Sequence, residues 1–178
     1  MRYMYENFLH SEAFDKLANH VKSKEFAWYA RLGAVDEADE ADKNPSFSNV
    51  LYHMYGPTSP SFDFVIPIIE RLKVQGLFRI KANLDIVNSD KALQPEAFHK
   101  DLDLDGDILW VMILYLNDCN GATLFEKDNV PVKSKANRAI IFPASMRHSG
   151  CHQTDIPFRY VINTIFAAED VPAGGKEF

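Results

Sequence analysis

The feature that most constrains the fold is a stretch of strict alternation, LFRIKANLDIV, which runs from Leu77 to Val87. Successive side chains of a β-strand point to opposite faces of the sheet, so this pattern marks a strand with one buried face. The apolar face would hold Phe78, Ile80, Ala82, Leu84 and Ile86, and the polar face Arg79, Lys81, Asn83 and Asp85. The segment therefore predicts a sheet that is covered on at least one side.

The second half of the chain continues with short strand-like segments that are separated by turn residues. These segments are DILWVMILYLN, DCNGATLFE, RAIIFPA and FRYVINTIF. Asn120 followed by Gly121 is a strong tight-turn signal, and Asp128 with Asn129 is a weaker one. Many short strands with turns between them predict a sandwich or a small barrel.

The first part of the chain has a more helical character. Apolar residues recur at helical spacing after Ser11, which predicts an amphipathic helix from Ser11 to about Ser23, and the stretch around Ser61 to Leu72 predicts a second helix. EFAWYARLGAV, between them, has the composition of a strand, and PAGGKEF at the end reads as a loose tail. We therefore expect one α+β, mainly β domain over 1–178, with a support region (1–75), a β core (76–166) and a tail (167–178).

The composition is that of an ordinary globular domain, with 178 residues of which 47% are hydrophobic and 25% charged. No apolar run is long enough to span a membrane, so we expect a soluble, intracellular and cytoplasmic protein with no membrane partner. The net charge of -6 argues against a nucleic-acid partner, because binding to phosphates depends on lysine and arginine. We expect Cys119 and Cys151 to be free thiols.

The stretch FHKDLDLDGDILW, from Phe98 to Trp110, contains half of a calcium-loop motif. Counting Asp101 as the first loop position places Gly106 at the sixth, as an EF-hand requires. The twelfth position is then Met112, which cannot bind calcium, and the residues that follow resemble a strand instead of a helix. The calcium motif is therefore incomplete.

The same stretch contains His99 and Asp101, an H-x-D pair whose side chains would project side by side from a strand. An imidazole and a carboxylate are two thirds of the 2-His-1-carboxylate set that suits Fe(II) and leaves open coordination positions. His148, which follows the apolar strand RAIIF, is the candidate third ligand, and His152 is the alternative. An arginine completes the pattern, because Arg159 at the start of RYVINTIF needs an anion if it faces the interior.

The order of these residues resembles the core of the Fe(II)- and 2-oxoglutarate-dependent oxygenases, in particular the prolyl 4-hydroxylase-like branch. The matching elements are His99-x-Asp101, YLN, NGATLF, NRAIIF, His148 and Arg159, within about residues 76 to 166. The resemblance implies a double-stranded β-helix, that is, a jelly roll or cupin-like barrel, with N-terminal supporting helices. It also implies Fe(II), 2-oxoglutarate and O2, with release of succinate and CO2 as a C-H bond is hydroxylated.

Carried over by position, the resemblance implies a role for each of a small set of residues. The iron ligands would be His99, Asp101 and His148. The residues that contact 2-oxoglutarate would be Arg159, Tyr115, Asn163, Asn83 and Thr123. Two departures stand out: RIKANLDIV lacks the tyrosine that many prolyl hydroxylases carry there, and Ile165 stands where the alkylated-base repair branch has a second arginine. The second departure further disfavours a nucleic-acid substrate.

The substrate depends on the loops around the mouth of the barrel, which include NVLYHMYGPTSPS and NSDKALQPEA. We expect a protein or peptide side chain, prolyl-like, or alternatively a free amino acid or small metabolite. The candidate substrate contacts are Tyr52, His53 and Tyr55. Two other functions remain open: a cupin-type metalloenzyme that does not use 2-oxoglutarate, and a non-catalytic ligand-binding barrel.

Overall fold

The structure, a computed structural model, describes residues 1–32, 45–87, 97–102 and 108–178. Within these residues the helices are α1 (Ser11–Val21), the 3-10 helix η1 (Phe62–Val65) and α2 (Ile66–Leu72). The large antiparallel sheet has the order β12 (Lys176–Glu177), β1 (Tyr3–Tyr5), β9 (Ala139–Pro143), β6 (Leu109–Tyr115), β11 (Phe158–Ala167), β5 (Gly76–Ile86), β3 (Pro45–His53) and β2 (Tyr29–Leu32), with β4 (Gly56–Pro57) paired to β3. The small sheet has the order β10 (His148–Cys151), β7 (Ala122–Phe125) and β8 (Val132–Lys133).

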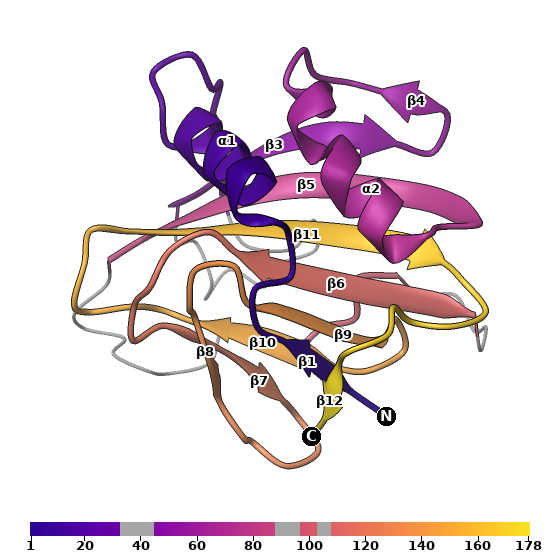
Figure 1. Cartoon of the computed structure of the whole chain (residues 1–178). Coiled ribbons are helices and arrows are strands. Elements are labelled where there is room, and N and C mark those ends of the chain that lie inside the picture. The colour runs from indigo at the N-terminus through magenta and orange to yellow at the C-terminus, as the bar shows by residue number, and fades with distance from the viewer. Residues whose placement is uncertain (33–44, 88–96, 103–107) are drawn as a thin grey trace.

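The helices cover one face of the large sheet, and the small sheet lies on the other side (Figure 1). Buried residues of α1 and α2, such as Leu17 and Ile68, form one core with Ile80, Ala82 and Ile162 of the sheet. The helix predicted from Ser11 is present as α1. It begins at Ser11, with His10 at the N-cap position. The helices are therefore held by burial of their apolar faces against the sheet.

A second core lies between the two sheets. It joins apolar side chains of the large sheet, such as Val111 and Ile165, to Phe125 of β7 and Val132 of β8. The prediction of a mainly β chain is thus confirmed. Within the described residues, no hydrogen-bonded ladder joins the edges of the two sheets, so this part of the chain forms two facing sheets.

Strand β5 has the predicted alternation from Ile80 to Leu84, but Phe78, expected on the same face, packs against the core between the sheets, because the register with β11 shifts between Ile165 and Phe166. Ile80, Ala82 and Leu84 are buried on the side of the helices. In the register with β11, Asp85 lies opposite Arg159 and Lys81 opposite Asn163. Directly opposed residues of antiparallel strands point to the same face, so Lys81 and Asp85 of β5 share with Arg159 and Asn163 of β11 the face toward the small sheet.

Asn120 and Gly121 do not form the tight hairpin turn that their sequence suggests, because β6 and β7 belong to different sheets. The two residues lie in the connection that crosses from one sheet to the other, where Asn120 exchanges hydrogen bonds with Thr154. A Cβ at Gly121 would lie 2.9 Å from Cδ of Arg159. Gly121 is thus required for space beside Arg159. Asn129, by contrast, lies in a turn with a φ of 54°.

The prediction that PAGGKEF is a loose tail is wrong. β12 pairs with β1, and the guanidinium of Arg2 lies over the rings of both Phe125 and Phe178. The two ends of the described chain therefore lie side by side at one edge of the large sheet, as Figure 1 shows. Both cysteines are free, as expected.

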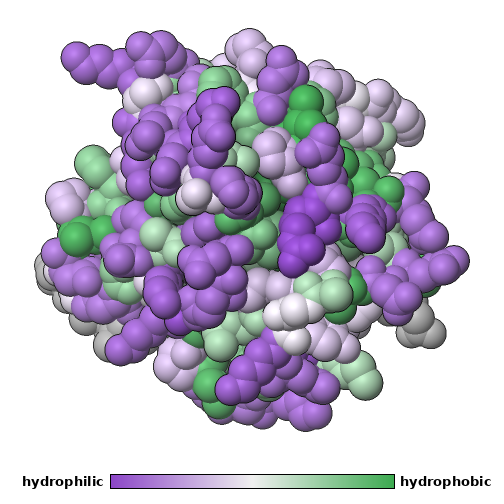
Figure 2. All heavy atoms as spheres, in the orientation of Figure 1, coloured by the Kyte–Doolittle hydropathy of each residue, from purple (hydrophilic) through white to green (hydrophobic). Residues whose placement is uncertain are grey.

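Several sequence features lie outside the described residues. These are Asp103, Asp105, Gly106 and Asp107 of the calcium-like motif, most of the acidic stretch from Val35 to Pro45, and 88–96. In the view of Figure 2, polar and charged side chains cover most of the face, and hydrophobic ones appear between them in small patches. Among the described residues, no helix is long and apolar enough to cross a membrane.

Candidate metal centre

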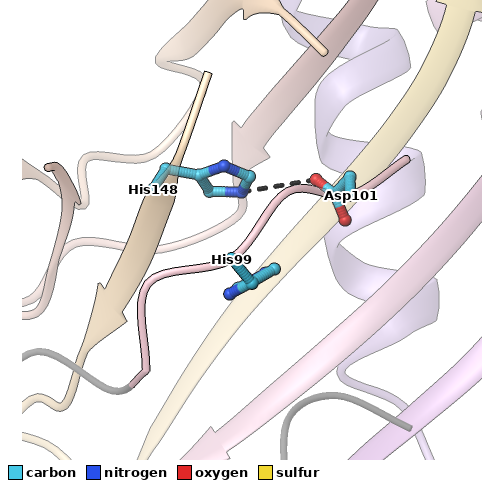
Figure 3. Close-up of side chains that lie close together, drawn as sticks. All are labelled: His99, Asp101 and His148. Atoms are coloured by element: carbon cyan, nitrogen blue, oxygen red, sulfur yellow. Dashed lines mark ion pairs between the residues drawn. The ribbon is translucent and has the colours of Figure 1, made fainter. Parts of the chain in front are cut away.

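The short segment 97–102 runs beside β10 and brings His99 and His148 together. Each backbone N–H donates to the carbonyl of the other residue, with N···O distances of 3.0 Å in both directions. His99 and Asp101 are two residues apart on this extended segment, so their side chains point to the same side. Figure 3 shows the three side chains of His99, Asp101 and His148 gathered at this point.

One potential ligand atom from each of these three residues lies within 4.8 Å of the other two. Nε2 of His148 is 3.3 Å from Oδ2 of Asp101. Two ligands at right angles on a metal with bonds of about 2.1 Å are about 3 Å apart, so the observed spacing is close to that of a coordinated set. His152, the alternative ligand, is buried outside this group.

The same nitrogen of both imidazoles, Nδ1, lies beside a backbone carbonyl. Nδ1 of His99 lies 3.1 Å from the carbonyl of Ala97, and Nδ1 of His148 lies 3.1 Å from the carbonyl of Met146. A carbonyl only accepts, so Nδ1 carries the proton and Nε2 of the neutral ring carries a lone pair. Nε2 of His148 faces the Asp101 carboxylate, so a metal ion at this point would be bound by both groups.

Asp101 is buried and is held by two further side chains. Nη2 of Arg79 donates to Oδ1 over 2.8 Å, and Nδ2 of Asn163 donates to Oδ2 over 2.8 Å. Burial alone would raise the pKa of this carboxyl, but His148, Arg79 and Asn163 outweigh it and hold the pKa well below its usual range. Asp101 is therefore a carboxylate at neutral pH, as a metal ligand must be.

The three residues border a cavity of about 100 Å³ between the sheets. Its polar lining consists of Ser46, Ser48, Lys81, Asn83, Asp85, His99, Asp101, Thr123, His148, Arg159 and Asn163. Ile113 and Val161 add apolar surface. The inner cavity therefore has room for a small molecule or for the tip of a larger one.

Arg159 lines the same cavity and is only 3% exposed. Its Nη1 donates to Oδ2 of Asp85 over 2.7 Å, its Nη2 is 3.4 Å from Oγ1 of Thr123, and its guanidinium lies 5.5 Å from the centre of the Tyr115 ring. Burial would lower the pKa of this guanidinium, but the charge of Asp85 outweighs burial and the pKa is raised. The cavity thus has the histidine pair with its carboxylate on one wall and a buried cation on another.

The structure brings most of the expected 2-oxoglutarate contacts to the cavity. Asn83, Thr123, Arg159 and Asn163 line it. Tyr115 is fully buried beneath Arg159, and its hydroxyl is hydrogen bonded to Oγ1 of Thr123 over 2.8 Å. Tyr115 is therefore positioned to act on the cavity through Thr123 and Arg159.

The three residues expected to contact substrate are not among those that line the cavity. Tyr52 packs against Phe62 and the core beneath the helices, on the other side of the sheet. His53 lies opposite Arg79 in the register but is exposed, and Tyr55 is 96% exposed. The cavity lining thus does not support these three contacts.

Two site residues were not singled out from the sequence: Arg79, which holds Asp101, and Asp85, which pairs with Arg159. Both belong to the polar face of the alternating strand β5. Their place on this face was the sequence signal that could have pointed to them as site residues. Alternation shows which face a residue occupies, but it does not show what lies opposite that face. The partners of Arg79 and Asp85 come from segments that lie far away in the sequence.

No family model and no curated protein matches this chain. Solved structures with a similar fold include a 2OG-Fe(II) oxygenase family oxidoreductase from Burkholderia pseudomallei, with a TM-score of 0.69 and 10% identity over 96% of this chain and 87% of the other. The epimerase SnoN, in complex with Fe3+, alpha ketoglutarate and nogalamycin RO, has a TM-score of 0.66 and 12% identity over 99% and 87%. A prolyl hydroxylase from Trichoplax adhaerens, in complex with a peptide fragment of hypoxia inducible factor, has a TM-score of 0.64 and 12% identity over 94% and 84%. The chain therefore has the fold of these enzymes.

Proposed function

We propose that this protein is an Fe(II)- and 2-oxoglutarate-dependent dioxygenase, with the whole chain acting as one oxygenase unit on a double-stranded β-helix. The observation that carries the proposal is the placement of His99, Asp101 and His148 around the same small cavity as the buried Arg159. One wall offers a 2-His-1-carboxylate set, and another offers a cation for a carboxylate. A dicarboxylic 2-oxo acid needs both at once.

The donor set fits Fe(II). Two imidazoles whose Nδ1 atoms lie beside backbone carbonyls, together with one ionised carboxylate, suit this metal and leave coordination positions open. When bound, Fe(II) supplies the position at which O2 is reduced, and 2-oxoglutarate supplies two electrons and leaves as succinate and CO2. Strand β5 contributes Arg79, whose hydrogen bond keeps the carboxylate of Asp101 in place.

The chain's own residues have separable tasks in this proposal. Arg159 binds the distal carboxylate of 2-oxoglutarate, with Thr123 and Asn83 beside it. Asn163 and Arg79 orient Asp101, as partners of metal ligands commonly do. Ile113 and Val161 form an apolar part of the cavity wall and limit the entry of water there.

For the reaction we propose hydroxylation of a C-H bond, in which one oxygen atom of O2 enters the substrate and the other enters succinate. A protein side chain, prolyl-like, is the first candidate substrate, and a free amino acid or small metabolite is the second. Similar structures support both, because one is a prolyl hydroxylase with a peptide and another is an epimerase with a small molecule. The cavity is compatible with either, since it has room for a small molecule or for the tip of a larger one.

Two other functions fit the site less well. A cupin-type metalloenzyme without 2-oxoglutarate has no need of a buried arginine on the cavity wall, and a non-catalytic ligand-binding barrel has no need of an intact ligand set. The decisive test is to incubate the purified protein with Fe(II), 2-oxoglutarate and O2, and to measure succinate. Mass spectrometry of treated cell extract then searches for products heavier by one oxygen atom. Absence of succinate above a metal-free control would contradict the proposal.

A further inference from the structure

Asp85 and Arg159 stand directly opposite each other on neighbouring strands, and both line the cavity. Nη1 of Arg159 is 2.7 Å from Oδ2 of Asp85. The side chain of Arg159 is 4% exposed and that of Asp85 is 22% exposed. The cation that faces the cavity is thus already paired with a carboxylate of the chain itself.

The rest of the Arg159 guanidinium is less well satisfied. Nη2 has only a long contact of 3.4 Å, with Oγ1 of Thr123. Nε is buried and has no hydrogen-bond partner within the described residues. Nε and Nη2 form the side edge of a guanidinium, which matches the two oxygens of a carboxylate. This edge of the guanidinium therefore has no close partner within the described residues while Asp85 stays on Nη1.

We propose that Asp85 is a specificity-determining residue that weakens the binding of dicarboxylic 2-oxo acids by placing a second negative charge on Arg159. This inference rests on the proposed function, since it takes 2-oxoglutarate as the ligand. Two carboxylates on one guanidinium lie about 5 Å apart, and their repulsion is poorly screened in a buried site. The repulsion acts on a ligand with a distal carboxylate and not on a 2-oxo acid without one.

The substitution Asp85→Asn isolates the charge. The amide oxygen of asparagine still accepts a hydrogen bond from Nη1, so Arg159 keeps a partner in the same place while the negative charge is lost. We expect the Kd of 2-oxoglutarate to fall by roughly tenfold or more in this variant. The Kd of 2-oxobutanoate, which has no distal carboxylate, should stay within about twofold of the wild-type value.

The experiment is calorimetric titration of the Mn(II)-loaded full chain with 2-oxoglutarate and, separately, with 2-oxobutanoate. The wild type is compared with Asp85→Asn, and with Asp63→Asn as a matched control, because Asp63 is an exposed carboxylate on η1 away from the cavity. Asp85→Ser, which is also neutral, serves as a second variant with the same expected result should the asparagine variant fail to fold. Thermal melting checks that each variant is folded.

Tighter binding of 2-oxoglutarate alone would support the inference. Unchanged or weaker binding of 2-oxoglutarate in the neutral variants would overturn it, because Asp85 would then be only a partner that positions Arg159, and the proposed function would stand. Equal tightening for both acids would also overturn it, since the effect would not concern the distal carboxylate. Absence of 2-oxoglutarate binding to the wild type and all variants would overturn both the inference and the proposed function.

Discussion

Arg79 donates a hydrogen bond of 2.8 Å to Oδ1 of Asp101, across the gap between β5 and the segment that carries the candidate metal ligands. The side chain of Asp101 is 6% exposed and that of Arg79 is 25% exposed. The contact leaves Oδ2 on the side of His148. Arg79, together with Asn163 on Oδ2, thus fixes which oxygen of the carboxylate faces His148.

Replacing Arg79 by glutamine should weaken metal binding by about 10- to 100-fold, the usual effect of losing the partner of a metal ligand. The reason is that Asp101 loses its orientation while all three ligands remain. Titration with Mn(II), followed by calorimetry, measures the effect. Arg71→Gln is the matched control, because Arg71 lies on α2 with its Nη2 on the carbonyl of Ala173. Equal metal affinity of Arg79→Gln and wild type would show that Arg79 has no such role.

Replacing either His99 or Asp101 by alanine should abolish both metal binding and the turnover of 2-oxoglutarate in the absence of substrate. Each substitution removes one of the three candidate ligands found among the described residues. Metal content by elemental analysis and succinate formation are the two measurements. His10→Ala, an exposed histidine at the start of α1, should change neither. Full succinate formation by both ligand variants would exclude this site as the centre of the activity.

Replacing Arg159 by alanine should chiefly raise the 2-oxoglutarate concentration required, by about 100-fold, because a charge-assisted pair is lost. Metal binding should persist, since Arg159 is not among the three ligands. The dependence of succinate formation on 2-oxoglutarate concentration, measured beside Mn(II) titration, separates the two effects. A requirement equal to that of the wild type would mean that the distal carboxylate binds elsewhere.

Replacing Gly121 by alanine should disturb the proposed binding site of the distal carboxylate, because Gly121 lies against the side chain of Arg159. The added Cβ would lie 2.9 Å from Cδ of Arg159 and 3.1 Å from the carbonyl oxygen of Cys151, so the arginine must move. We expect a loss of about 1–3 kcal/mol in the free energy of unfolding, as for other overpacked sites, together with weaker 2-oxoglutarate binding. Urea unfolding and calorimetry measure these. Gly56→Ala, where a Cβ meets nothing within 4 Å, is the control and should lack both effects.

Replacing Tyr115 by phenylalanine tests whether this hydroxyl acts directly on the ligand. In its fully buried position the hydroxyl lies 2.8 Å from Oγ1 of Thr123 and 3.3 Å from the carbonyl oxygen of Val132. We expect a cost of about 1 kcal/mol in the free energy of unfolding and a smaller change in 2-oxoglutarate affinity than in Arg159→Ala. A loss of affinity as large as that of the arginine variant would instead assign Tyr115 a direct contact.

The sequence by itself determined the local properties of this protein. Alternation in β5 predicted correctly that Ile80, Ala82 and Leu84 are buried under the helices, because the period of a strand depends only on backbone geometry. The spacing of His99 and Asp101 likewise indicated that the two side chains share a side, and apolar periodicity located α1.

Only the tertiary structure decided which distant residues meet. The pairing of Arg79 with Asp101 and that of Asp85 with Arg159 both depend on cross-strand register and on the approach of one segment to a sheet. The same holds for Gly121, which lies beside Arg159 and not in a hairpin turn. It also holds for β12, near the end of the chain, which pairs with β1. These contacts are set by packing between segments far apart in the chain, and no local pattern records that packing.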